Sequence, residues 1–141
     1  MNFARPGRVA AEERAAVERA RALLDFVTLL RLEAEPARVL SGGQRKLLEL
    51  ARVLMAEPQA ILLDEPAAGV NPTLLELIIE RVRRLNADGR TILLIEHNMD
   101  MVARLCSRVV VMAGGRLLAA GTPAEVARDA AVVGAYLGDP A

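Results

Sequence analysis

The sequence has one cysteine, one lysine and one histidine, and it has no long apolar run. A lone Cys106 cannot form an internal disulfide, which favours a reducing compartment and a small packed thiol. No segment approaches the roughly 18 uninterrupted apolar residues of a membrane-spanning helix, and the N-terminus lacks the apolar stretch of a secretory signal. We therefore expect a cytoplasmic protein that reaches a membrane only through partner subunits.

Charge of neither sign dominates, because 18 Lys and Arg residues balance 18 Asp and Glu residues. Without a basic excess there is no electrostatic footprint for nucleic acid, so we expect no nucleic-acid partner. The 141 residues, of which 53% are hydrophobic, are enough for one compact globular domain with a buried core.

Three segments carry helical patterns. Residues 10–32 repeat apolar residues at three- and four-residue spacing, which predicts an amphipathic helix ended by Pro36. Ser41 precedes a second helix that Pro58 closes, and Asp88-Gly89 ends a third. The expected apolar stripes of these two helices are Leu47, Leu50, Ala51, Leu54 and Met55, and then Leu74, Ile78, Val82 and Leu85.

Two short apolar runs, AILLDEP (60–66) and TILLIEH (91–97), each end in polar residues and are typical of buried parallel strands. A short helix over 99–105 follows, then strands over 109–112 and 117–120 around Gly114-Gly115, and a helix that starts at Thr122. Strands separated by helices predict an α/β fold with a mostly parallel sheet, flanking helices and a small helical piece at the N-terminus.

The candidate chemistry lies where the two apolar strands end. Asp64 and Glu65 follow the first strand and His97 follows the second, and ligands of open parallel sheets bind beyond these carboxyl ends. One carboxylate can hold a magnesium ion through water while the other orients an attacking water. Alone, an Asp-Glu-Pro triplet is also compatible with a loop that starts with solvated acids.

The segment LSGGQ (40–44) is the second candidate. Ser41 can cap a helix, and the two glycines allow backbone N–H groups to approach an anion closely. A helix N-terminus with free amides and a positive dipole end suits a γ-phosphate. Alone, the segment is equally an ordinary capped helix.

In this order and at this spacing, LSGGQRKLLELARVLMAEP, ILLDEP and His97 resemble the signature, the Walker B strand and the switch histidine of ABC ATPases. The resemblance implies a partial P-loop NTPase fold. Residues 1–58 would be a remnant of the helical subdomain with the signature helix, and residues 59–141 the C-terminal part of the core. DEPAAGVNP, IEHNMDMV, GTPAEV and GAYLGDP are similar to the ATP-binding subunits of branched-chain amino-acid importers.

The resemblance also implies site roles. Asp64 would bind Mg²⁺ through water, Glu65 would polarise the attacking water, and His97 would contact the γ-phosphate of ATP. Asn71 stands at the D-loop position, where many relatives have aspartate. The signature residues would act in trans on ATP held by a second ABC subunit, with permease subunits as further partners; they are Ser41, Gly42, Gly43 and Gln44.

The P-loop pattern G-x-x-x-x-G-K-[ST] is absent, because the sequence has no Gly-Lys pair and Lys46 lies inside the signature helix. The family's adenine-stacking aromatic and Q-loop glutamine precede the region covered. We therefore expect Met1 to lie downstream of half an ATP site. The isolated chain should neither bind nor hydrolyse ATP, and it should self-associate through unprotected strand edges.

Three functions are compatible with these residues. The first is the ATP-hydrolysing, energy-coupling subunit of a transporter, represented by its C-terminal half. The second is a non-catalytic partner that donates a signature or regulates another subunit. The third, an ABC domain of DNA repair or translation, is disfavoured because the sequence has no long heptad arms, no extra basic segments and a GTPAEV tail.

Overall fold

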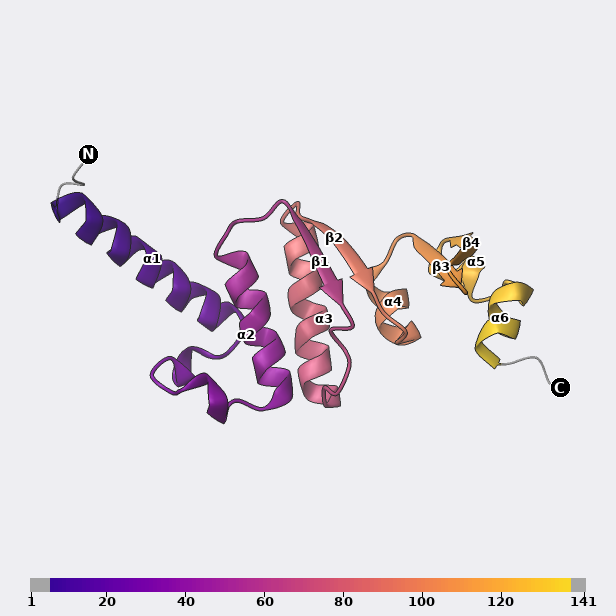
Figure 1. The fold of residues 1–141 in the computed structure, drawn as a ribbon, viewed down its shortest axis with the longest axis horizontal. Coiled ribbons are helices and arrows are strands. Elements are labelled where there is room, and N and C mark those ends of the chain that lie inside the picture. The colour runs from indigo at the N-terminus through magenta and orange to yellow at the C-terminus, as the bar shows by residue number, and fades with distance from the viewer. Residues whose placement is uncertain (1–5, 138–141) are drawn as a thin grey trace. The chain divides into compact units, whose positions relative to one another are not determined.

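The computed structural model describes residues 6–137, so the start of the chain and the last residues of the GAYLGDP segment lie outside the description. The chain forms two compact units, residues 1–61 with 68–93 and residues 62–67 with 94–141. Short 3-10 helices cover Leu30–Leu32 and Ala37–Val39. The other elements, drawn in Figure 1, are α1 (Pro6–Phe26), α2 (Gly42–Leu54), β1 (Ala60–Asp64), α3 (Pro72–Ala87), β2 (Thr91–Ile95), α4 (Met99–Leu105), β3 (Val109–Ala113), β4 (Arg116–Gly121), α5 (Pro123–Val126) and α6 (Ala130–Leu137).

The first unit is built on contacts of α2 with α1 and with α3 (Figure 1). The stripe predicted for α3 is confirmed for Ile78, Val82 and Leu85, which are buried, whereas Leu74 is half-buried. On α2 the prediction was wrong for Met55, because the helix ends at Leu54 and Met55 is an exposed C-cap residue. The side chains of this unit with less than 2% exposure are Val27, Leu47, Ile61, Ile79 and Val82.

The helix expected over 10–32 is shorter, and Pro36 does not end it. α1 stops at Phe26 in a Schellman motif, in which Thr28 N–H donates to Asp25 O (2.9 Å) and Leu29 N–H donates to Leu24 O (2.7 Å). Thr28 has φ of 60°, a left-handed conformation that a β-branched residue rarely adopts. The chain turns here because Leu29 is only 3% exposed and packs into the core.

Replacing Thr28 by glycine should therefore stabilise the protein. The left-handed conformation costs a non-glycine residue about 1–2 kcal/mol, and glycine removes this cost. Part of the gain is lost because glycine also makes the unfolded chain more flexible. We expect a net gain of about 1 kcal/mol in the free energy of unfolding, measured by urea denaturation. Ala16→Gly in the exposed middle of α1 is the control and should cost about 1 kcal/mol. A loss of stability in Thr28→Gly would contradict the motif.

β1 and β2 are hydrogen-bonded neighbours, and both pass from the first unit into the second. Thr91 N–H donates to Gln59 O (2.8 Å) and Glu65 N–H donates to Ile95 O (2.9 Å), so the strands run parallel and end together. Alternate residues of each strand are exposed, while Ile61 is buried. α3 connects the strands, as in a βαβ unit.

The second unit holds a different sheet, since β3 and β4 pair antiparallel as a hairpin. The turn uses Gly114 and Gly115, both with positive φ, and α5 and α6 contact the hairpin. The helix start expected at Thr122 is confirmed as a capping box with Glu125, and hydrogen bonds from Thr122 hold the pKa of the Glu125 carboxyl below its usual value. The α/β class is thus confirmed, with parallel pairing in one of the two sheets.

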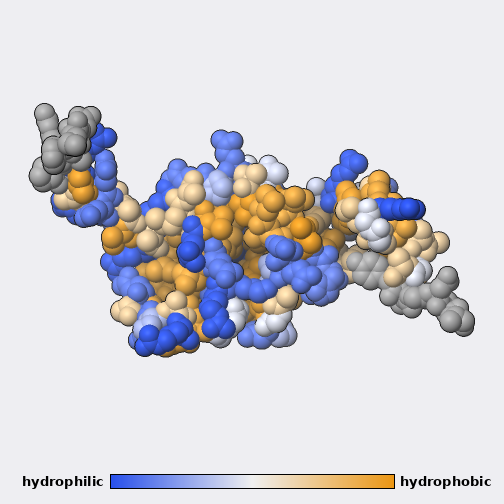
Figure 2. All heavy atoms as spheres, viewed as in Figure 1, coloured by the Kyte–Doolittle hydropathy of each residue, from blue (hydrophilic) through white to orange (hydrophobic). Residues whose placement is uncertain are grey.

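Large apolar side chains also lie on the surface. In Figure 2 they appear where β1 and β2 are drawn in Figure 1, and over the hairpin. Leu62 is 72% exposed, and Leu93 and Ile95 are each 56% exposed. Among the described helices none has both the length and the apolarity to cross a bilayer.

These strand residues predict self-association. Exposed apolar residues on short strands with unprotected edges recruit other chains. We expect light scattering during size-exclusion chromatography to show a mass that rises with concentration. The double variant Leu93→Thr/Ile95→Thr should lower this apparent mass, because threonine keeps strand propensity but removes apolar surface. Val39→Thr, an exposed residue outside the strands, is the matched control. A monomer at every concentration would contradict the prediction.

Candidate functional site

The predicted carboxylates lie at the carboxyl end of β1, in the second unit. Asp64 is the last residue of the strand and Glu65 follows it, and both are exposed. Glu65 has φ of 44°, and such a left-handed non-glycine residue costs of order 1 kcal/mol or more. Strain of this kind persists only where neighbours hold it, and here the hydrogen bond to Ile95 O does so. The conformation turns the chain immediately after the strand.

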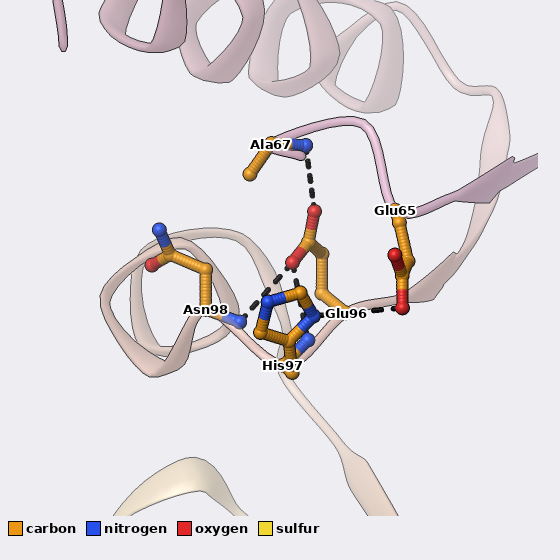
Figure 3. Close-up of polar contacts among 5 residues, drawn as sticks. All are labelled: Glu65, Ala67, Glu96, His97 and Asn98. Carbon is orange, nitrogen blue, oxygen red and sulfur yellow. Dashed lines mark hydrogen bonds and ion pairs between the residues drawn. The ribbon is translucent and has the colours of Figure 1, made fainter. Parts of the chain in front are cut away.

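Glu65 and His97 meet across the ends of the two strands. His97 Nδ1 lies 3.5 Å from Glu65 Oε1, with the two side chains 68% and 55% exposed (Figure 3). The contact is an ion pair when the imidazole is protonated. Two solvent-accessible groups, an acceptor carboxylate and an imidazole, are therefore positioned to act on the same water.

Glu96 is the residue that sequence reasoning missed. Its Oε1 accepts from Ala67 N–H (2.7 Å), and its Oε2 accepts from His97 N–H and Asn98 N–H (3.1 Å each; Figure 3). Asn98 in turn caps α4 by accepting from Met101 N–H (3.0 Å). The available signal was a glutamate between an apolar strand and a helix cap, a position rich in unpaired backbone N–H groups.

The signature segment begins α2 in the first unit. Ser41 and Gln44 form a reciprocal capping box, in which Ser41 N–H donates to Gln44 Oε1 (2.9 Å) and Gln44 N–H donates to Ser41 Oγ (3.3 Å). The N–H groups of Gly42 and Gly43 are the two of the first turn that the capping box does not engage. This leaves amide donors at the positive end of the helix.

The two signature glycines are needed for different reasons. A Cβ on Gly42 would have open space within 4 Å, which fits the predicted close approach of an anion. Gly43 is buried instead, and a Cβ there would lie 2.6 Å from Leu74 Cδ1 and 3.5 Å from Val70 Cγ1. Gly43 thus lets α2 pack closely against Leu74 and Val70, whereas its predicted contact with an anion through the backbone N–H stays a prediction.

Asn71 caps α3. Its Oδ1 accepts from Leu74 N–H (3.0 Å), and Pro72 follows at the first helical position. Aspartate and asparagine cap helices about equally well, so the departure from the family's aspartate leaves the helix start intact. Asn71 and the signature belong to the first unit, while Asp64, Glu65 and His97 belong to the second.

Other titratable groups add little to the site. Cys106 is half-buried rather than fully packed, and burial raises the pKa of its thiol, which disfavours a thiolate nucleophile. Within residues 6–137 no group of three or more His, Cys, Asp or Glu side chains is arranged to hold a metal ion. The carboxylates of Asp64 and Glu65 are hard oxygen donors of the kind Mg²⁺ prefers.

The sequence matches two family models, the ABC transporter family over residues 3–68 and the branched-chain amino acid ATP-binding cassette transporter family over residues 116–141. The probable branched-chain amino acid transport ATP-binding protein LivG of Archaeoglobus fulgidus is 40% identical over 132 residues, covering 94% of this chain and 51% of that protein. Nod factor export ATP-binding protein I of Ralstonia nicotianae is 43% identical over 104 residues, covering 74% of this chain and 32% of that protein.

Among solved structures, an ATP-binding cassette of an ABC transporter in its ADP conformation superposes with a TM-score of 0.80 at 40% identity. That alignment covers 89% of this chain and 51% of the other. The chain thus spans about half the length of the LivG relative and of this cassette. The motifs, the fold and these relatives agree, and the chain belongs to the ATP-binding domains of ABC transporters.

Proposed function

We propose that this chain is part of the ATP-hydrolysing subunit of an ABC transporter that imports branched-chain amino acids. The observation that carries the proposal is the Glu65–His97 pair, 3.5 Å apart at the carboxyl ends of two paired parallel strands. Import of branched-chain amino acids is supported by the model matched at residues 116–141 and by the LivG relative.

Each side chain then has a role in the complete ATP site. Asp64 would hold Mg²⁺ through water, and the ion would neutralise charge on the phosphates. Glu65 would orient and polarise the attacking water, and His97 would contact the γ-phosphate. The amides of the signature turn, with Ser41 and Gln44 as its cap, would face ATP held by another subunit, next to the D-loop that Asn71 ends.

The partners follow from these roles. A signature that acts in trans requires a second ABC ATPase subunit, and transport requires transmembrane permease subunits. We therefore place the chain in the cytoplasm, peripheral on the inner face of the membrane, without a nucleic-acid partner. The P-loop, which this sequence lacks, would be supplied by the remaining half of the ATP-binding domain.

Uptake measurements test the proposed substrate. The chain would be combined with a P-loop half of the domain and the permease subunits in proteoliposomes, and ATP-dependent uptake of labelled leucine would be compared with that of glutamate. We expect uptake of leucine only, and its loss in Asp64→Asn. Since the Nod factor export protein is also similar, ATP-driven export, or hydrolysis without leucine uptake, would overturn the import assignment.

A second function has an observation of its own. The chain has an intact signature cap with an open Gly42 but no Gly-Lys pair, as expected of a partner that only donates a signature. The two functions can be distinguished by mixing the chain with an ABC ATPase that has its P-loop but carries a disabled signature. Restored turnover that survives Glu65→Gln in this chain would favour the signature donor, because such a donor does not use Glu65.

A further inference from the structure

The Glu96 carboxylate joins two loops that lie far apart in the sequence. Its two oxygens accept three backbone N–H donors, one from Ala67 and two from His97 and Asn98 (Figure 3). The side chain is half-buried, and the 2.7 Å distance to Ala67 N is typical of a charge-assisted hydrogen bond. All of these residues belong to the second unit.

Two hydrogen bonds hold the chain on either side of the Glu65 side chain. The first is at Glu65 itself, whose backbone N–H donates to the carbonyl oxygen of Ile95, the last residue of β2. Two residues later, Ala67 N–H donates to the Glu96 carboxylate. The left-handed backbone of Glu65 lies between these two attachments, so releasing the second one leaves the strained residue held on one side only.

Both carboxylate oxygens of Glu96 accept from the backbone, which fixes the side chain between the two loops. A role limited to the start of α4 is insufficient, since Asn98 caps that helix and the bond to Ala67 lies outside it. We propose that Glu96 is a positioning residue that ties the loop after β1 to the turn after β2 and so holds Glu65 opposite His97. The consequence for ATP turnover rests on the proposed function.

Three variants distinguish the effect of the length of the Glu96 side chain from the effect of its charge. Glu96→Asp keeps the charge but is one methylene shorter, so it can still accept from His97 and Asn98 N–H while losing Ala67. Glu96→Gln keeps the length but replaces one acceptor oxygen by a donor. Asn98→Ala removes the cap of α4 and is the control.

Hydrogen–deuterium exchange of the 141-residue chain gives the first readout. We expect exchange at the Ala67 amide to accelerate roughly tenfold or more in Glu96→Asp and Glu96→Gln. Asn98→Ala should accelerate the start of α4 and leave Ala67 unchanged. Unchanged protection of Ala67 in both Glu96 variants would overturn the proposal.

The second readout uses His97, the only histidine in the chain, whose ring signals need no assignment among others. We would record the His97 imidazole shifts at one pH in the unchanged chain, Glu65→Gln, Glu96→Asp and the double variant. If Glu96 positions Glu65, the change caused by Glu65→Gln shrinks in the Glu96→Asp background. Equal changes in both backgrounds would overturn the proposal. Neither readout needs ATP, so the two ideas can fail separately. If both readouts support the role of Glu96 while Glu65→Gln leaves ATP turnover unchanged, only the proposed function is refuted.

Discussion

The 141-residue chain alone should give no heat of specific binding when titrated with Mg-ATP. The P-loop lysine and its cradle of backbone amides supply most of the phosphate contacts in this class of enzymes, and the sequence has no Gly-Lys pair. Asp64, Glu65 and His97 contribute exposed side chains but no amide cradle. We expect a Kd weaker than about 1 mM, which corresponds to less than about 4 kcal/mol of binding free energy.

Isothermal titration calorimetry checks this result, with a full-length relative that contains a P-loop as the positive control in the same buffer. ATPase activity should likewise stay at the level of a buffer blank. A micromolar Kd that Asp64→Asn abolishes would contradict the prediction. It would show that the phosphates are held by residues outside the P-loop pattern.

Glu65→Gln should stop turnover once a P-loop half is supplied as a second chain or by fusion. The amide keeps the size of the side chain but does not polarise water as a carboxylate does. We expect kcat to fall roughly 10²- to 10⁴-fold, with nucleotide affinity nearly unchanged. Phosphate release and nucleotide binding would be measured on the same preparation.

The matched control is Glu49→Gln, the same chemical change on the exposed side of α2, which should leave turnover unchanged. Equal turnover in Glu65→Gln and the unchanged protein would place the catalytic base elsewhere. A loss of both turnover and nucleotide affinity would point to a folding defect at the strained Glu65 backbone rather than to lost base catalysis.

Local sequence signals predicted most of the elements. Short apolar runs predicted β1 and β2, and apolar residues at helical spacing predicted α3 and α4. Both signals can be recognised within one short segment of the sequence. Capping residues placed the starts of α2 and α5, since a side chain that accepts from a backbone N–H three residues away is a local interaction. Asp64, Glu65 and His97 were predicted as site residues for the same reason, as polar residues that end apolar strands.

Tertiary contacts decided what local patterns left open. α1 ends at Phe26 because Leu29 then packs into the core. This turn requires a left-handed Thr28, which the residue's own conformational preference would not predict. Gly43 is buried because Leu74 and Val70 of a later segment pack against it, whereas Gly42 looks the same in sequence and stays open. Glu96 bonds to Ala67 across 29 residues, so its clamp exists only once β1 and β2 are paired. Sequence alone therefore determined which residues are candidates for the chemistry, and packing between distant segments determined how they are held.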